Sequence, residues 1–319
     1  MFKWEKLGRV FNPLNVTGRY WLSEFAQAPS TLEFEDFIRV YFSSRSSRDI
    51  NNQFVSYSSY IDLDKNDLFK IINIANKPIL SLGNKGSFDE FGTYPFSPIR
   101  KGNEIWGYYA GWTRCESVPF NTAIGLGISR DNGKTFEKIG KGPILSYSLN
   151  EPFILSGPKI RNFNNKYYLF YIAGKKWLTI DGKPEMSTKI RVAISEDGVK
   201  WDKQNTNLIL DKLSGDEAQA SPDVFFANDK YHMFFCYWDP NSFRKTKARR
   251  IGYASSLDLI NWIRDDSKAG IDVSEIGFDN EMIAYPHVFD VDGKVFMLYL
   301  GNEVGRYGFG IAELKGELI

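Results

Sequence analysis

The chain has little of the chemistry that marks several common classes of protein. Only two of its 319 residues are cysteine, Cys115 and Cys236, and only two are histidine. The cysteines lie far apart without metal-ligand spacing, which argues against a disulfide framework and against a zinc site. The net charge is +1 and no basic run stands out, so we expect no surface dedicated to nucleic acid or to an anionic membrane.

Long apolar runs are also missing. The opening residues, Met-Phe-Lys-Trp-Glu-Lys, contain no apolar signal core, and no stretch approaches the roughly 20 apolar residues that span a membrane. We therefore expect a cytoplasmic protein without a membrane partner. No cofactor is expected, and a calcium ion on a central axis is not predicted.

What the chain does contain is an internal repeat. Successive copies begin at prolines that stand 66, 63, 64 and 64 residues apart, namely Pro29, Pro95, Pro158, Pro222 and Pro286. A period of this size indicates one supersecondary unit repeated, with each copy burying its face against the next. Five such units account for nearly all of the sequence, so we expect a single domain over residues 1–319.

Each unit reads as four antiparallel strands. In the third unit a hairpin over 158–171 turns at Asn164-Asn165-Lys166, and such turns between aromatic and β-branched runs favour hairpins because they tolerate positive φ. A third strand over 190–195 leads through a Ser-x-Asp-Gly turn to Trp201, which opens a fourth strand. Without a convincing long amphipathic helix, this pattern predicts an all-β fold, a five-bladed β-propeller with four strands per blade.

The two ends of the sequence complement each other. Residues 2–8 look like the fourth strands at 135–140 and 200–203, whereas the last unit stops after its third strand at 307–312. We expect the N-terminal strand to complete the last blade. This arrangement closes the ring and removes the exposed edges that a linear array would have.

The long connections of such units gather on one face, because strand direction alternates within each blade. These connections are the loops between second and third strands and the links to the next blade. Function tends to lie on loops held by a rigid scaffold. Carboxylates, arginines and tryptophans converge on this face. They suit a sugar, since the charged groups bond its hydroxyls and aromatic faces cover its C–H surface.

Four carboxylates are the candidate catalytic residues. Asp223 stands one residue after its axial proline, and Glu217 stands five residues before the same proline. Glu281 and Asp89 lie in the corresponding links before the fifth and second units. Two carboxylates flanking a glycosidic bond act as acid and as base or nucleophile. We predict Glu217 or Glu281 as the acid and Asp223 or Asp89 as its partner.

Seven further residues are candidates for substrate binding. His287 follows Pro286 in the slot that Asp223 occupies after Pro222, and histidine titrates near neutrality. The others come from the long connections of the same face. The full set is His287, Arg114, Trp112, Glu303, Arg306, Trp238 and Gln27.

The five-unit layout, the proline-led strands and the Ser-x-Asp-Gly-x-x-Trp turn at 195–201 resemble the five-bladed propeller glycoside hydrolases of families 43, 32, 68 and 130. The resemblance covers the whole chain at the level of pattern, and residues 195–201 and 220–224 are its most specific pieces. It implies a carbohydrate or glycoconjugate substrate. The turn at 129–136 also looks like the Asp-box of sialidases, and we assign it a structural role.

The chain departs from the family 43 pattern at the positions where that family carries its catalytic acids. That family carries Asp just before the first-blade proline, Asp just after the second-blade proline, and Glu two residues before the third-blade proline. The matching positions here are Ala28, Phe96 and Ser156, none of them acidic. Only Asp223 keeps a Pro-Asp arrangement, and it lies in the fourth blade. The usual triad is therefore not carried over.

We therefore predict a glycan-active enzyme, a glycoside hydrolase that cleaves its bond with paired carboxylates. Two alternatives stay open. One is a phosphorylase or glycosyl transferase on the same scaffold, in which phosphate or a sugar acceptor replaces water. The other is a non-catalytic carbohydrate-binding propeller, which the missing acids favour.

Overall fold

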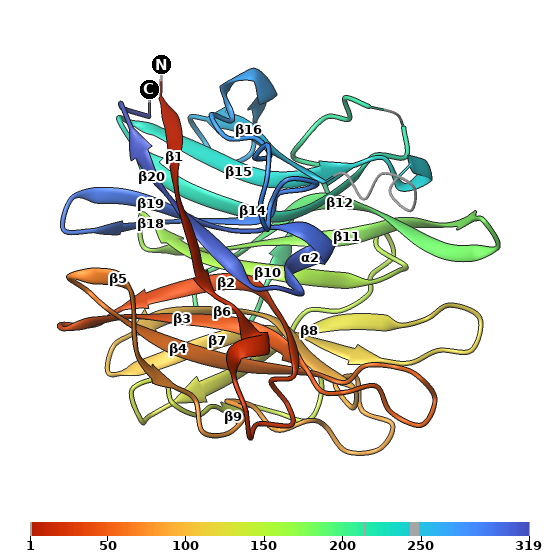
Figure 1. Cartoon of the computed structure of the whole chain (residues 1–319). Helices are drawn as coiled ribbons and strands as arrows, with labels where there is room; N and C mark the ends of the chain where they lie inside the picture. Colours follow the sequence, from red (N-terminus) through yellow and green to blue (C-terminus); the bar gives the residue numbers. More distant parts are fainter. Residues whose placement is uncertain (1, 214, 243–248, 319) are drawn as a thin grey trace.

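The computed structural model describes residues 2–213, 215–242 and 249–318, and these residues form strands almost throughout (Figure 1). The all-β expectation is confirmed. The helical elements include η1 (Pro13–Asn15), η2 (Asp266–Lys268) and α2 (Asn302–Gly305). The strands are β1 (Lys3–Phe11), β2 (Glu24–Glu33), β3 (Phe37–Arg45), β4 (Ser56–Asp64), β5 (Asp67–Ile74), β6 (Gly92–Lys101), β7 (Glu104–Thr113), β8 (Asn121–Ser129), β9 (Glu137–Lys138), β10 (Leu155–Phe163), β11 (Lys166–Ile180), β12 (Lys183–Ser195), β13 (Asp202–Lys203), β14 (Ala218–Ala227), β15 (Lys230–Trp238), β16 (Arg250–Ser256), β17 (Ile263–Arg264), β18 (Ala284–Val291), β19 (Lys294–Leu300) and β20 (Phe309–Lys315).

The strands pair into antiparallel groups of four. Three groups are separate sheets, in the orders β1-β20-β19-β18, β10-β11-β12-β13 and β14-β15-β16-β17. The remaining sheet joins β2–β5 to β6–β9 through one parallel pairing, between Ser56 and Gly92. We call each set of four a strand group, and the connection from its fourth strand to the next group a link.

The predicted pairing of the N-terminal strand with the last unit is confirmed. β1 runs antiparallel to β20, from Lys3 opposite Lys315 to Phe11 opposite Phe309 (Figure 1). The two ends of the chain therefore belong to one sheet. Its edge is formed by the first strand of the sequence.

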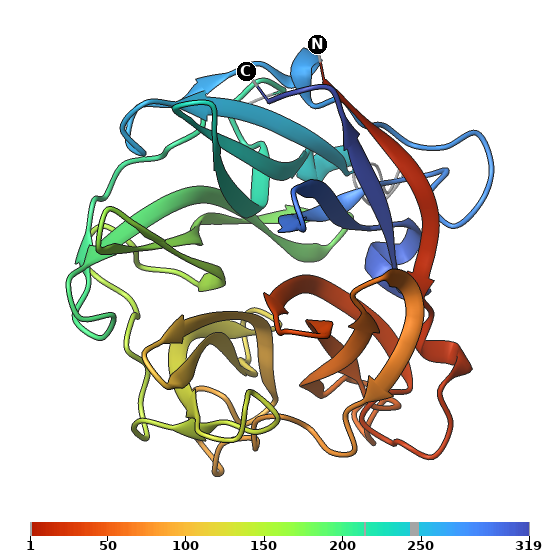
Figure 2. The ribbon, with the colours of Figure 1, turned by 90° about the vertical axis from the view of Figure 1, so that its left-hand side faces the viewer.

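The first strands of the groups lie at the centre of the molecule. β2 contacts β6, β6 contacts β10, β10 contacts β14, β14 contacts β18, and β18 returns to β2. Figure 2 shows the groups arranged around this common centre. Residues that are hundreds of positions apart in the sequence therefore meet near one axis.

Every first strand carries a bulge at its axial proline. The pairing with the second strand skips register there, for example between Ala220 and Asp223 and between Ala284 and His287. Four of the residues before these prolines have φ between 50° and 62°, namely Ala28, Gly157, Ser221 and Tyr285. Residues other than glycine rarely adopt this conformation, and a residue before proline normally prefers extended backbone. Bulges of this kind redirect side chains and are common beside active sites.

Apolar side chains fill the spaces between neighbouring groups. Phe42 of β3 packs with Phe309 of β20 at 5.9 Å between ring centroids, in a cluster that also buries Leu298. Complete burial of such a side chain contributes about 1.5–3 kcal/mol. These contacts between groups hold the central strands in register.

The Ser-x-Asp turns stabilise the outer connections of the groups. Asp197 accepts hydrogen bonds from the backbone N–H groups of Val199 and Lys200, each at 2.8 Å. These bonds lower the pKa of Asp197 to about 2. Asp258 likewise accepts from the backbone N–H groups two and three residues further on, and Asp131 accepts from those three and four residues further on. The motif therefore acts as a turn that satisfies backbone donors.

Candidate active site

A cavity of about 660 Å³ opens at the centre, and residues from all five strand groups or their loops line it. We call it the central cavity. Its aromatic lining includes Tyr94, Trp112, Phe120, Trp177, Trp238 and Tyr285. A concave site of this size, with many aromatic side chains and a few polar groups, is typical of small-molecule sites.

One wall of the cavity is a run of aromatic rings. Trp112 stacks on Tyr94 with centroids 5.6 Å apart, and Phe120 lies 4.4 Å from Trp112 on its other side. Phe120 meets the edge of Trp177 at 5.5 Å. The indole N–H of Trp112 donates to the backbone carbonyl of Tyr94, which fixes the ring. Trp112, predicted as a binding residue, lies in this wall.

A long hairpin arm supplies part of the lining. β11 and β12 are 15 and 13 residues long, and they stay paired out to Ile180 opposite Lys183 (Figure 1). Residues 175–177 belong to β11 and not to a loop between the second and third strands. The arm brings Trp177, Glu185 and Thr188 to the cavity. Sequence analysis missed Glu185 and Thr188.

Glu303 reaches the cavity from a strained turn. Glu303 and Val304 have φ values of 52° and 56°, and a β-branched residue is seldom found there. The Val304 carbonyl accepts a 2.6 Å bond from Gln27 Nε2. Glu303 itself contacts Tyr307 Oη at 3.2 Å and Arg306 Nη1 at 3.1 Å. The turn thus holds one carboxylate in place.

Four of the seven predicted binding residues line the cavity, namely Trp112, Glu303, Trp238 and Gln27. Arg306 lies outside the lining and forms ion pairs with Glu303 at 3.1 Å and with Glu24 at 3.0 Å. Arg114 pairs with Asp49 at 2.7 Å and stacks on Phe91, outside the cavity lining.

Three arginines in the lining were not among the predicted site residues. Arg45 lies 4.3 Å from the Phe25 ring and donates to Gln27 Oε1 at 3.0 Å. Arg48 lies over the Phe54 ring at 4.0 Å. Arg249 lies over the Trp238 ring at 4.0 Å. The described part of the lining therefore combines three cations with two carboxylates, Glu185 and Glu303.

The predicted acids of the links lie elsewhere, in a repeated structural contact. Four buried carboxylates stand 62, 66 and 62 residues apart, and we call them the link acids: Asp89, Glu151, Glu217 and Asp279. Tyrosine hydroxyls of the second strands donate to three of them. The pairs are Tyr109 with Asp89 at 2.8 Å, Tyr171 with Glu151 at 2.7 Å, and Tyr299 with Asp279 at 3.1 Å.

A cation from the fourth strand completes each contact. The ion pairs are Lys138 with Asp89 at 2.5 Å, Lys203 with Glu151 at 2.6 Å, Arg264 with Glu217 at 2.7 Å, and Lys6 with Asp279 at 2.7 Å. Each link acid therefore ties its link to the second or fourth strand of the group that follows. A buried carboxylate requires such partners, because an unpaired one is costly.

Three acids predicted to be catalytic, namely Glu217, Asp89 and Glu281, lie outside the central cavity. Glu217 is fully buried, and it also accepts bonds from the backbone N–H groups of Lys212 and Leu213. Neither Glu217 nor Asp89 lines the central cavity. Glu281 is exposed and likewise lies outside the lining.

Asp223 is buried among cations at the centre of the ring. Its carboxylate lies 2.6 Å from Arg161 Nη2 and accepts a 2.6 Å bond from the backbone N–H of Val288. Burial alone raises the pKa of Asp223, but Arg161, His287 and Lys159 outweigh it and hold this pKa well below its usual range. Asp223, predicted as catalytic, and His287, predicted as a binding residue, are buried and lie outside the lining of the central cavity.

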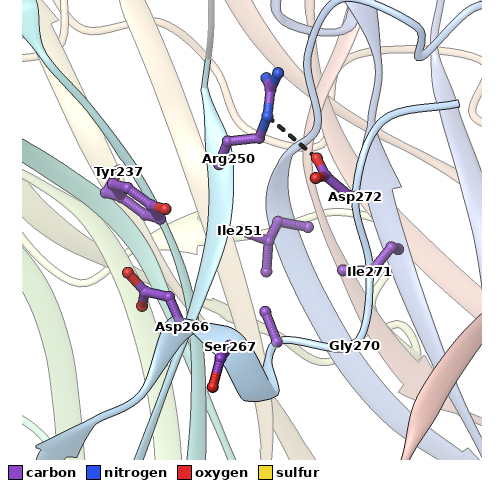
Figure 3. Close-up of a pocket in the computed structure, with 9 residues that line it drawn as sticks. Tyr237, Arg250, Ile251, Asp266, Ser267, Gly270, Ile271 and Asp272 are labelled. Carbon is purple, nitrogen blue, oxygen red and sulfur yellow. Dashed lines mark ion pairs between the residues drawn. The ribbon is translucent and has the colours of Figure 1, made fainter.

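A second pocket, of about 430 Å³, lies beside β16 and η2 (Figure 3). Arg250 and Asp272 form an ion pair of 3.1 Å at its edge. Asp266 in this pocket is paired with Arg264 at 2.9 Å. The lining comes from one strand group and the link after it, whereas the central cavity draws on all five groups.

The described parts of the chain contain no group of three or more His, Cys, Asp or Glu residues placed to hold a metal ion. Within residues 2–213, 215–242 and 249–318, no helix has the length and apolar character needed to cross a membrane.

No protein-family model matches the chain. Two uncharacterized proteins of Mycobacterium tuberculosis, MT1551 and Rv1502, are each 36% identical over 313 residues, which is 98% of this chain and 99% of theirs. A β-1,2-mannobiose phosphorylase of Thermoanaerobacter sp. is 26% identical over 178 residues, covering 52% of this chain and 54% of that protein.

Solved structures share the fold at low sequence identity. A glycoside hydrolase superimposes with a TM-score of 0.77 at 18% identity, covering 99% of this chain and 93% of its own. A member of the GH130 family of mannoside phosphorylases and hydrolases gives 0.71 at 13% identity, with coverages of 98% and 94%. A thermostable family-43 glycoside hydrolase gives 0.63 at 16% identity, with coverages of 91% and 88%. The two mycobacterial proteins and this chain therefore belong to one family, and the chain shares its fold with glycoside hydrolases of families 43, 32 and 130.

Proposed function

We propose that the protein is a glycan-active enzyme that acts on a glycosidic bond held in the central cavity. The observation that carries this proposal is the lining of the cavity, where aromatic faces, neutral polar groups, arginines and two carboxylates converge from all five strand groups. We interpret those groups as the five blades of one propeller. The partial sequence relative named a mannobiose phosphorylase supports the same class of chemistry.

Glu185 and Glu303 are the carboxylates we assign to bond cleavage. They are the acidic residues in the described lining, and they come from separate elements, the β12 arm and the α2 turn. Cleavage of a glycosidic bond uses one carboxylic acid to protonate the leaving oxygen and one carboxylate as base or nucleophile. We assign this pair in place of the four acids predicted from the sequence, which lie outside the cavity lining, namely Glu217, Glu281, Asp223 and Asp89.

Phosphorolysis is a second candidate, favoured by Arg45, Arg48 and Arg249 in the lining. In this reaction a phosphate oxygen attacks the anomeric carbon and forms a new C–O bond while the glycosidic C–O bond breaks. The departing oxygen takes a proton from a carboxylic acid, which leaves a sugar phosphate and a free sugar. Outside this lining lie Arg114, Lys175, Lys176 and Arg306.

A panel of defined mannosides, glucosides, arabinosides and fructosides, each with and without inorganic phosphate, tests the proposal. Free sugars formed without phosphate identify a hydrolase, and a sugar phosphate formed only with phosphate identifies a phosphorylase. Binding of a glycan without cleavage supports the non-catalytic alternative and contradicts the enzyme. The matched variant is Glu303→Gln, which should bind the same glycan and cleave it more slowly.

A further inference from the structure

Two tyrosine hydroxyls meet in the central cavity. Tyr94 and Tyr285 precede the axial prolines of the second and fifth strand groups, and their hydroxyl oxygens lie 3.5 Å apart. Arg249 Nη1 lies 3.5 Å from the Tyr285 hydroxyl. These are long contacts between groups that all carry donor hydrogens. An acceptor placed among them would shorten and strengthen each interaction.

Arg45 lines the same cavity as the tyrosine pair, and its charge acts on Tyr94. Its Nε is buried and has no hydrogen-bond acceptor in the described structure. The guanidinium lies over the rings of Phe25 and Phe54, at 4.3 and 5.0 Å, and donates to Gln27 Oε1. No carboxylate of the described residues pairs with Arg45. A fixed guanidinium without a carboxylate partner is prepared to bind an oxyanion from outside the chain.

The protonation of Tyr94 fits the same role. Burial, and then the neighbouring Tyr285, raise the pKa of Tyr94 well above its usual value, and Arg45 and Arg249 only partly oppose this rise. The Tyr94 hydroxyl therefore keeps its proton at neutral pH. It can donate a hydrogen bond to an anion.

We propose that Arg45, Arg249, Tyr94 and Tyr285 form an oxyanion-binding subsite in the central cavity. The ligand is a phosphate or carboxylate group, supplied either as inorganic phosphate or as an anionic substituent of the sugar itself. Hydrogen bonds from charged donors to an anion are about twice as strong as neutral ones, so a neutral sugar hydroxyl would use this cluster poorly. The identity of the sugar rests on the proposed function, but binding of the anion does not.

The carboxylates of the cavity do not neutralise the positive charge of this subsite. Glu303 is already bonded to Arg306 Nη1 and to the Tyr307 hydroxyl. Among the described residues, Glu185 of the hairpin arm forms no ion pair with Arg45 or Arg249. Among the described residues of the lining, three arginines against two carboxylates leave one excess positive charge.

Direct binding is measured by titrating the full-length protein with inorganic phosphate and with glucuronate in a calorimeter. The wild type should bind at least one of them, and Arg45→Gln should weaken that binding about 10–100-fold. Tyr285→Phe, which removes one hydroxyl, should weaken it several-fold and is the gentler change to the fold. The matched control is Arg130→Gln, since Arg130 is exposed and outside the cavity, and it should bind as the wild type does.

Two results would overturn the subsite. One is the absence of binding of either anion at millimolar concentration, and the other is equal affinity in wild type, Arg45→Gln and Tyr285→Phe. If a neutral glycan is nevertheless cleaved, the proposed function survives and the subsite does not. If anions bind as expected and no glycan is cleaved, the subsite survives and the proposed function does not.

Kinetics distinguish the two sources of the anion. If inorganic phosphate is the ligand, turnover should require it, and Arg45→Gln should raise the KM for phosphate. If the sugar carries the charge, Arg45→Gln should lose turnover of uronides or sugar phosphates and keep that of neutral analogues. If Arg45→Gln lost turnover equally on all substrates, without a change in the KM for phosphate, both sources of the anion would be contradicted.

Discussion

His287 Nδ1 lies 3.2 Å from the carboxylate of Asp223, from a position 64 residues further along the chain. The backbone N–H of Thr31 donates to the other ring nitrogen, Nε2, at 2.8 Å. A neutral His287 therefore carries its proton on Nδ1, facing Asp223. Lys159 of β10 adds a fourth strand to the contact, since its Nζ lies 3.6 Å from the Asp223 carboxylate and donates to the carbonyl of Pro29 at 3.1 Å. This polar network joins four of the five central strands.

The network makes stability depend on pH. Burial and the charge of Lys159 lower the pKa of His287 from 6.5 to about 4. Between these values the unfolded chain binds a proton at this site that the folded chain excludes. The free energy of unfolding should therefore fall as the pH drops from 6.5 to 4, by up to about 1.4 kcal/mol per pH unit.

Urea unfolding of the wild type and of His287→Gln across this range measures the effect. The variant should show a shallower decline, because it has no imidazole to protonate. Parallel curves for the two proteins would show that His287 titrates normally in the folded state.

Asp223→Asn should destabilise the fold strongly. The change leaves Lys159 and Arg161 buried or partly buried without their anion, and breaking a buried pair typically costs about 3–5 kcal/mol. Chemical denaturation measures the loss. Asp229→Asn is the matched control, since Asp229 is exposed in a turn at φ 58°, which asparagine tolerates. Equal stability of the two variants would refute a structural role for Asp223.

The link acids should act on stability and not on turnover. Tyr171→Phe removes the donor that lies 2.7 Å from Glu151, and the expected cost is about 1.5–3 kcal/mol for a bond to a charged group. Glu217→Gln should lower the melting temperature while the remaining folded protein keeps its kcat. A kcat loss of a hundredfold or more in a well-folded Glu217→Gln protein would restore Glu217 as a catalytic candidate.

Trp177 should contribute to sugar affinity with little effect on the fold. It is partly exposed at the cavity and packs edge-on against Phe120. Trp177→Ala should weaken binding of the cleaved glycan about 10-fold, the equivalent of about 1.4 kcal/mol. Phe69→Ala, at a 45% exposed ring on β5 away from the cavity, is the control. Similar affinities of both variants would place the sugar elsewhere.

Much of the fold was predictable because the sequence repeats at a nearly constant interval. The prolines repeat at nearly constant spacing, each copy begins with a hairpin, and three copies carry a Ser-x-Asp turn, at Ser129, Ser195 and Ser256. The closing strand was predictable as well, since residues 2–8 look like the other fourth strands. These features depend on local turn chemistry and strand patterning, which act over short stretches of sequence.

The site was harder to predict because it depends on which side chains contact one another in the folded chain. Acids before the axial prolines suggested catalysis, yet buried carboxylates need cations, and the cations come from the fourth strands. A signal for this was present in the sequence. Tyr109, Tyr171, Tyr237 and Tyr299 are spaced 62, 66 and 62 residues apart, as the link acids are. Arg45, Arg249 and Glu185 reach the cavity through loop and arm geometry that has no comparable pattern.

The central claim is that a glycosidic bond is broken by carboxylates within the central cavity. It is tested most directly by product analysis of a glycan panel, with and without phosphate, for wild type, Glu185→Gln and Glu303→Gln. We predict cleavage of at least one glycan by the wild type, and a loss of about 10²–10⁴ in kcat when an acid or base is removed. Undiminished cleavage by both folded variants, or no cleavage by the wild type, would contradict the account.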